Sequence, residues 1–218
     1  MIIGFKKKFL FIHIPKCAGD SIRELLLSSA NGGAQFLRKH SGNIDAERVM
    51  GEEIKRFTAF AVVRNPFDQV VSFYEHLRKP LHMSPEEIER QYPGTGSRLL
   101  PVWASELAME LDFPDFVREV YSGAHDERPQ AAWFGDSLSW LTSVDGKLAP
   151  VCALRFERLR EDFSKLSADL RLEGELPWRN ASGDQNPRTD YRAYYDSASR
   201  GIIEARFAPT LRLFGYHF

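Results

Sequence analysis

Short apolar runs alternate with helical patterns along this chain. Residues 8–14 and 57–63 are nearly continuous apolar runs rich in Phe, Val and Ile, which is typical of strands buried on both faces of a sheet. Apolar positions at helical spacing follow each run, in residues 22–27 and 66–78. The pattern therefore predicts two strand–loop–helix units, with Pro66 in the first turn of the second helix.

Weaker patterns predict the remaining elements. Strands are expected at 35–40, 138–142 and 147–156, and helices from 43 or 45 to 54, at 84–91, 113–121 and 157–170, and over 191–214 with a break at Pro209. Asp145-Gly146 marks a hairpin between the last two strands. Residues 79–101 and 172–190 hold several prolines and glycines, and we expect them to form loops that can close over a substrate.

Strands that alternate with helices indicate an α/β fold. We expect a single domain over residues 1–218, in which helices flank both faces of a central, mostly parallel sheet in three layers. In such sheets, ligands bind at the carboxyl ends of the strands. Attention therefore falls on residues 15–21 and 64–72, which follow the two buried strands.

The composition removes several classes of protein. A chain of 218 residues with 43% hydrophobic and 27% charged residues is unlike disordered or collagen-like proteins. The net charge of -1 argues against a nucleic-acid coat protein, which would be strongly basic. Residues 1–60 still hold ten Lys and Arg against six Asp and Glu, a balance that reflects either chance or a local anion site.

Membrane insertion, disulfides and metal ligation are not indicated. No apolar run approaches the roughly 18–20 residues that span a bilayer, and the stretch FLFIHI near the start is too short for a signal peptide. We interpret the start as a buried strand. Cys17 and Cys152 make no disulfide framework, and no Cys or His pair has zinc-ligand spacing. We expect a cytoplasmic protein without a bound metal.

The loop at residues 15–21, PKCAGDS, has the composition of an anion site. The N–H groups and the dipole of a helix start favour negative charge, and Gly19 lets the backbone approach a phosphate. Lys16 adds a positive charge, and Ser21 a hydroxyl. The loop is built like a P-loop but is not GxxxxGK[ST], and no Mg²⁺-holding set is visible, which argues against an ordinary ATPase or kinase. The alternative interpretation of Lys16 is a solvated lysine at the surface.

Cys17 within this loop and His13 before it have simpler interpretations. Cys17 is interpreted as a small loop residue, because a nucleophilic cysteine needs a positioned histidine. His13 is interpreted as a core histidine.

Arg64 ends the second buried strand, and Ser72 follows about two turns into the next helix. An arginine beside a helical hydroxyl can hold a phosphate, although Arg64 could instead pair with Asp68. Taken with residues 15–21, two anion sites at neighbouring strand ends predict a ligand with two separated phosphates.

These two segments carry a family resemblance. FIHIPKCAGDS and VVRNPFDQVVSFY resemble the two signature segments of the sulfotransferases, above all the carbohydrate branch of Golgi-type and bacterial enzymes, whose first motif reads like IPKTAGTS. LRFERL at 154–159 resembles a third family segment, and FGY at 214–216 is similar to the end of the family domain. The resemblance covers most of the chain and implies a P-loop-like fold.

The resemblance implies a donor and an acceptor. The donor is 3′-phosphoadenosine 5′-phosphosulfate (PAPS), and the acceptor is a hydroxyl, most simply that of a carbohydrate. We expect no required metal, no nucleic-acid partner and no transmembrane segment. The 5′-phosphosulfate would be held by the loop residues Lys16, Cys17, Ala18, Gly19, Asp20 and Ser21, and the 3′-phosphate by Arg64 and Ser72.

The chain departs from the family pattern at Asp20, where Thr or Ser is usual. A carboxylate removes a hydroxyl donor and adds like charge near the anion. Asp20 could therefore turn outward as a helix cap or weaken donor binding. Cys17 in place of Thr is a milder change.

Lys16 and His40 are the predicted catalytic residues. Lys16 would follow charge onto the leaving oxygen, and His40, which lies between the two donor segments, would take the acceptor proton near pH 7. His40 could equally be an exposed loop histidine, with Asp68, Glu75 and His76 as rival bases. Arg188 and Arg192 could reach the 3′-phosphate or an acidic acceptor, or could form surface ion pairs. The other function classes are a kinase-like nucleotide-binding enzyme and a non-catalytic protein that retains the PAPS site.

Overall fold

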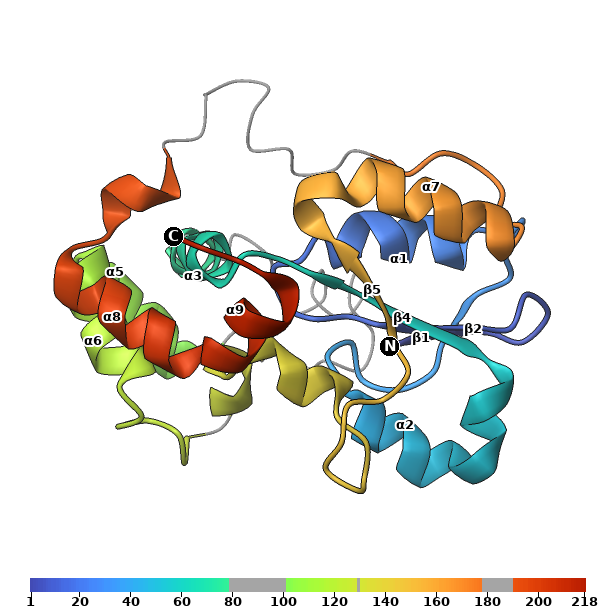
Figure 1. Ribbon diagram of the computed structural model, residues 1–218, viewed down its shortest axis with the longest axis horizontal. Helices are drawn as coiled ribbons and strands as arrows, with labels where there is room; N and C mark the ends of the chain where they lie inside the picture. The colour runs from blue at the N-terminus through green and yellow to red at the C-terminus, as the bar shows by residue number, and fades with distance from the viewer. Residues whose placement is uncertain (79–100, 129, 178–189) are drawn as a thin grey trace. The chain divides into compact units, whose positions relative to one another are not determined.

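The computed structural model describes residues 1–78, 101–128, 130–177 and 190–218 (Figure 1). The chain divides into two compact units, one made of Met1–Arg64 with Ser137–Pro187 and the other of Asn65–Asp136 with Arg188–Phe218. The helix expected at 84–91, most of the loops expected at 79–101 and 172–190, and Arg188 lie outside the described residues.

A five-stranded sheet forms the centre of the first unit. Its strands are β1 (Ile2–Gly4), β2 (Phe9–Ile12), β3 (Ala34–Gln35), β4 (Thr58–Val63) and β5 (Cys152–Arg155), in the order β3-β1-β2-β4-β5. β2 pairs with β4, and β4 with β5, in parallel, whereas β1 is antiparallel to both of its neighbours. Four strands therefore share one direction, and the mostly parallel sheet predicted from the sequence is confirmed.

Helices lie on both sides of this sheet. They are α1 (Gly19–Leu27), α2 (Asn43–Met50) and α7 (Leu159–Asp169), with the short 3₁₀ helices η1 (Gly51–Arg56), η3 (Ser137–Leu141) and η4 (Phe156–Arg158). α1 and α7 lie on one side and α2 on the other (Figure 1). In α1, Ile22, Leu25 and Leu26 recur at helical spacing and are buried, so the layer forms because the helix has one apolar face.

The regular structure described in the second unit is helical and has an aromatic core. Its elements are α3 (Pro66–Leu77), α5 (Val102–Glu110), α6 (Phe113–Tyr121), η2 (Ala131–Phe134), η5 (Tyr191–Tyr194), α8 (Ser197–Arg206) and α9 (Ala208–Phe214). Rings that include Phe67, Phe73, Tyr74, Phe116 and Phe134 fill the core. Pro66 lies in the first turn of α3, as predicted.

The strand predicted at 138–142 is wrong, and the one at 147–156 is too long. Residues 137–141 form η3, only Cys152–Arg155 are in a strand, and the antiparallel hairpin is reduced to one bridge between Thr142 and Leu148. The physical reason is a side chain from α2. The carboxylate of Glu47 accepts hydrogen bonds from the backbone N–H of Val144 and the hydroxyl of Ser143, each at 2.8 Å. These side-chain bonds anchor the turn in place of a ladder of backbone hydrogen bonds between two strands.

Other boundaries also differ from the predictions. The first sixteen residues form two antiparallel strands rather than one, with Lys8 in a left-handed turn at φ 55°. The strand expected at 35–40 is only β3, and the helix at 102–110 was not anticipated. The helical region at 191–214 is divided into three pieces, and Pro209 lies in the first turn of α9. The break near this proline is confirmed, because proline fits only that turn of a helix.

Candidate functional site

The loop between β2 and α1 has an unusual backbone. Lys16 and Ala18 have φ values of 62° and 56°, in the left-handed region, on either side of Cys17, whose φ is negative. This region costs a residue with a Cβ about 1–2 kcal/mol, and alternation of φ sign turns successive N–H groups toward one concave side. Ala18 begins α1 without a side-chain cap. Such a backbone can form an anion-binding concavity, and the anion site at this loop stays a prediction.

Arg64 ties this loop to the neighbouring strand. Because β2 and β4 are parallel neighbours, the residues after them meet at one sheet edge. Nη1 of Arg64 donates a hydrogen bond to the carbonyl oxygen of Lys16 at 2.9 Å, and the guanidinium carbon lies 4.1 Å from the ring centre of Phe156. Arg64 is only 3% exposed. The prediction that these strand ends come together is confirmed, and Arg64 supports the loop through its hydrogen bond to the Lys16 backbone.

Gly19 leaves room for the ring of His13. A Cβ placed on Gly19 would lie 2.0 Å from Cδ2 and Nε2 of His13. His13 is buried, as predicted for a core histidine. Burial above all holds the pKa of His13 well below its usual value, so the ring is neutral. The glycine is therefore needed for packing against His13, whatever else approaches the loop.

His40 lies beside His13 with a defined tautomer. Nδ1 of His40 is 2.8 Å from the carbonyl oxygen of His13, and the two ring centres are 4.7 Å apart. A carbonyl can only accept, so Nδ1 carries the proton and Nε2 carries the lone pair. Burial lowers the pKa of His40 to about 3, against a smaller raising effect of the His13 carbonyl. His40 is thus a neutral histidine at the loop and not an exposed one.

Asp20 forms an ion pair instead of a helix cap. Its Oδ1 lies 2.7 Å from Nζ of Lys39, and its side chain is 49% exposed. Burial raises the pKa of Asp20, but Lys39, by charge and hydrogen bond, and then His40 and Lys16 outweigh it, so the pKa of Asp20 is lowered. The carboxylate is ionised and stands next to a cation. The interpretation of Asp20 as a helix cap is wrong, because α1 begins at Gly19 with Ala18 as its N-cap.

Cys17 and Ser21 are both buried. The Cys17 thiol lies 3.5 Å from the carbonyl oxygen of Pro15, which agrees with a packing role rather than a nucleophilic one. Ser21 is in the first turn of α1, where a hydroxyl is near the helix start.

Ser72 and the rival bases belong to the second unit. Ser72, Asp68, Glu75 and His76 all lie on α3. Tyr194 donates a hydrogen bond to Oε1 of Glu75 at 3.3 Å. The role of Ser72 in phosphate binding stays a prediction. Arg192 stacks on Tyr191, with its guanidinium carbon 4.5 Å from the ring centre, and pairs with Asp190.

Sequence reasoning missed three residues of this site. Lys39, Phe156 and Trp140 contact Asp20, Arg64 and His40 respectively. Only Phe156 carried a signal, since it lies in the third resembling segment. Lys39 and Trp140 are brought to the loop by folding alone. In the ranges that the structure describes, no group of His, Cys, Asp and Glu could hold a metal ion, and no helix is long and apolar enough to cross a membrane.

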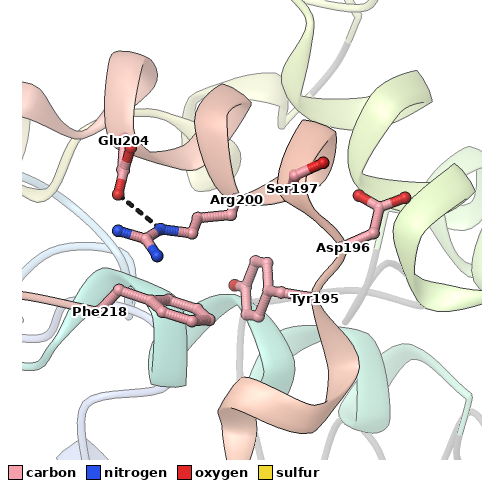
Figure 2. Close-up of a pocket in the computed structure, with 6 residues that line it drawn as sticks. All are labelled: Tyr195, Asp196, Ser197, Arg200, Glu204 and Phe218. Atoms are coloured by element: carbon pink, nitrogen blue, oxygen red, sulfur yellow. Dashed lines mark hydrogen bonds and ion pairs between the residues drawn. The ribbon is translucent and has the colours of Figure 1, made fainter.

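The second unit contains a pocket of about 420 Å³ (Figure 2). Arg200 lies over Phe218, 4.4 Å from the ring centre, and pairs with Glu204 at 2.8 Å. Asp196 in turn pairs with Arg118. None of the predicted site residues lines this pocket, and each of its charged groups has an oppositely charged partner.

Comparison with known proteins identifies one family. The sequence model described as the Sulfotransferase family matches residues 1–217, a range that spans both units. No curated protein and no solved structure gives a significant match.

Replacing Gly19 tests the contact with His13. Gly19→Ala places a Cβ where the ring lies, so we expect the free energy of unfolding to fall by about 1–3 kcal/mol. Gly201→Ala, in α8 with open space around it, should raise it by about 0.5–1 kcal/mol. Urea unfolding measures both. A Gly19→Ala protein as stable as the wild type would show that the ring does not pack there.

The depressed pKa of His40 predicts an acid-labile fold. A histidine with a pKa of about 3 when folded and about 6.5 when unfolded binds its proton more readily in the unfolded state. Its contribution to stability is complete above pH 6.5 and is lost as the pH falls toward 3, with about 2 kcal/mol gone at pH 5. Urea unfolding at pH 7 and pH 5 measures the loss. Between these pH values, His40→Gln should lose less free energy of unfolding than wild type, whereas a change at the exposed His217, His217→Gln, should lose as much as wild type.

Proposed function

Because the chain belongs to the sulfotransferase family, we propose that it moves a sulfuryl group from PAPS to a hydroxyl of a carbohydrate. One observation carries this proposal. Two cationic residues, Lys16 and Arg64, follow adjacent parallel strands and are linked through the hydrogen bond from Arg64 to the Lys16 carbonyl. A ligand with two separated anionic groups suits such a pair, and the sheet with helices on both sides is consistent with a P-loop-like fold.

The loop residues would bind the 5′ end of the donor. The N–H groups of Cys17, Ala18 and Gly19, the start of α1 and the Ser21 hydroxyl favour an anion here. The donor supplies a sulfuryl group on a good leaving phosphate, so a metal is not needed. Lys16 stabilises the negative charge that develops on the leaving oxygen.

Arg64 would serve the 3′-phosphate as well as the loop. A guanidinium carries five N–H donors, so its bond to Lys16 does not by itself prevent it from binding a phosphate. Ser72 is proposed as its partner on the strength of the family motif. Because Arg64 also supports the loop, its replacement should disturb both phosphate sites rather than one.

His40 is proposed as the base that takes the acceptor proton. Its Nδ1 donates to the His13 carbonyl, so the lone pair that would accept the proton of a hydroxyl is on Nε2. The pKa of about 3 keeps the ring neutral at every ordinary pH. Such a base is weaker than the histidine near pH 6.5 that we expected from the sequence, but the negative charge of a bound donor would raise its pKa.

Binding of the 3′,5′-bisphosphate product is the first test. At 100 times its Kd, a ligand stabilises the folded state by about 2.7 kcal/mol, which is roughly 5–10 °C in Tm for a chain of this size. We expect this shift with the bisphosphate and much less with ATP plus Mg²⁺. Lys165→Ala, at an exposed position in α7, should keep the shift. Equal shifts with both nucleotides would favour the kinase-like alternative.

Turnover of labelled PAPS separates an enzyme from a binding protein. A panel of neutral and uronate-containing oligosaccharides supplies the acceptor. At saturating donor, Lys16→Ala should lose about 10²–10³ in rate and His40→Ala about 10²–10⁴ with bisphosphate binding retained. Lys165→Ala and His217→Ala are matched controls and should keep wild-type rates.

The pH profile gives a further check on His40. The acid limb of the pH profile should lie at a lower pH in kcat/KM for PAPS, which reports the free enzyme, than in kcat, which reports the enzyme with donor bound. A His40→Ala protein with wild-type turnover and the same limb would move the role to Asp68, Glu75 or His76. Binding without turnover on any acceptor would leave a protein that only retains the donor site.

A further inference from the structure

Lys39 connects the segment that carries His40 to the first turn of α1. Its Nζ lies 2.7 Å from Oδ1 of Asp20, and its side chain is only 18% exposed. Asp20 stands within the anion loop, and His40 is the next residue after Lys39. One ion pair therefore joins the two parts of the site that are separate in sequence.

We propose that Lys39 is a positioning residue, which holds His40 against the anion loop through Asp20 and neutralises the carboxylate that this chain carries there. The inference rests on the proposed function, because it assigns Lys39 to the same reaction. It also accounts for Asp20, whose charge would otherwise oppose a phosphate in the loop.

The geometry favours a positioning role over a stabilising one. Asp20 is half exposed, and ion pairs with an exposed partner add little to stability. Nδ1 of the His40 ring donates a hydrogen bond to the His13 carbonyl, and this bond is one axis about which the ring can pivot. A second restraint on the adjacent residue limits that pivot and thereby the direction of Nε2. The Trp140 ring, 6.2 Å from that of His40 between ring centres, closes another side.

Charge and position make different predictions for the two partners. Asp20→Ala removes a negative charge and leaves the Lys39 cation, so the bisphosphate should bind about fivefold more tightly. Lys39→Met leaves the carboxylate without its cation, so binding should weaken by about the same factor. Both variants lose the restraint on His40, so turnover should fall in both, by about 10–100-fold.

Two double variants complete the test. Asp20→Ala with Lys39→Met restores a neutral loop, so bisphosphate binding should return to within about threefold of wild type, with turnover no lower than in the single variants. The exchanged pair, Asp20→Lys with Lys39→Asp, re-forms the ion pair and should recover part of the lost turnover.

The matched control is the pair between Lys165 and Glu161 in α7. It has the same 2.7 Å separation but is exposed at both partners. Lys165→Met and Glu161→Gln should leave binding and turnover at wild-type values. Calorimetry with the 3′,5′-bisphosphate gives binding, and labelled PAPS with the most active oligosaccharide of the panel gives turnover. Thermal unfolding identifies any variant that fails to fold, in which case Lys39→Gln and the exchanged pair replace it.

A third measurement needs no donor. The ring nitrogens of His40, assigned with the His40→Ala variant, report its tautomer by NMR. We expect a single Nδ1–H form in wild type and in both control variants, and averaging between tautomers in Asp20→Ala and Lys39→Met. Unchanged turnover and an unchanged His40 spectrum in these two variants would overturn the inference while the proposed function stands.

Failure of the proposed function would look different. If wild-type protein neither binds the bisphosphate nor uses PAPS, that function is wrong. The NMR comparison then decides the positioning role alone. Averaging in the two variants supports it, and an unchanged spectrum overturns it.

Discussion

Arg64 donates its hydrogen bond to the carbonyl of Lys16 from the end of the neighbouring parallel strand, and the geometry of the loop depends on this contact. The left-handed backbone of Lys16 and Ala18 is costly for residues with a Cβ, so it needs support from outside the loop. A buried guanidinium stacked on Phe156 provides that support. The same strand pairing that builds the sheet therefore also shapes the proposed donor site.

Burial explains the chemical state of the two histidines. His13 fills the space left by the missing side chain of Gly19, and its carbonyl determines which nitrogen of His40 holds the proton. Removal from water lowers the pKa of both rings, because the charged form loses more solvation than the neutral one. His40 therefore has a fixed tautomer, but in the absence of ligand its lowered pKa makes it a weak base.

The loop also shows how one unusual residue can be accommodated. Asp20 would place a negative charge beside an anion bound in the loop. Lys39 lies within ion-pair distance of that carboxylate, so the local charge is balanced within the protein. The two residues are far apart in sequence, and neither alone indicates the other. The proposal that they act together on His40 follows from this distance.

Local pattern in the sequence determined much of this protein: the two buried strands, the helices after them, the position of Lys16 and Arg64 at their ends, and the family. These depend on periodicity and on residues close together in the chain. Folding was needed to show that Glu47 anchors the turn at residues 143–144, that Gly19 leaves room for the His13 ring, that His40 is neutral with its proton on Nδ1, and that Lys39 pairs with Asp20. Each of these depends on burial or on a contact between distant segments, which composition and spacing do not encode.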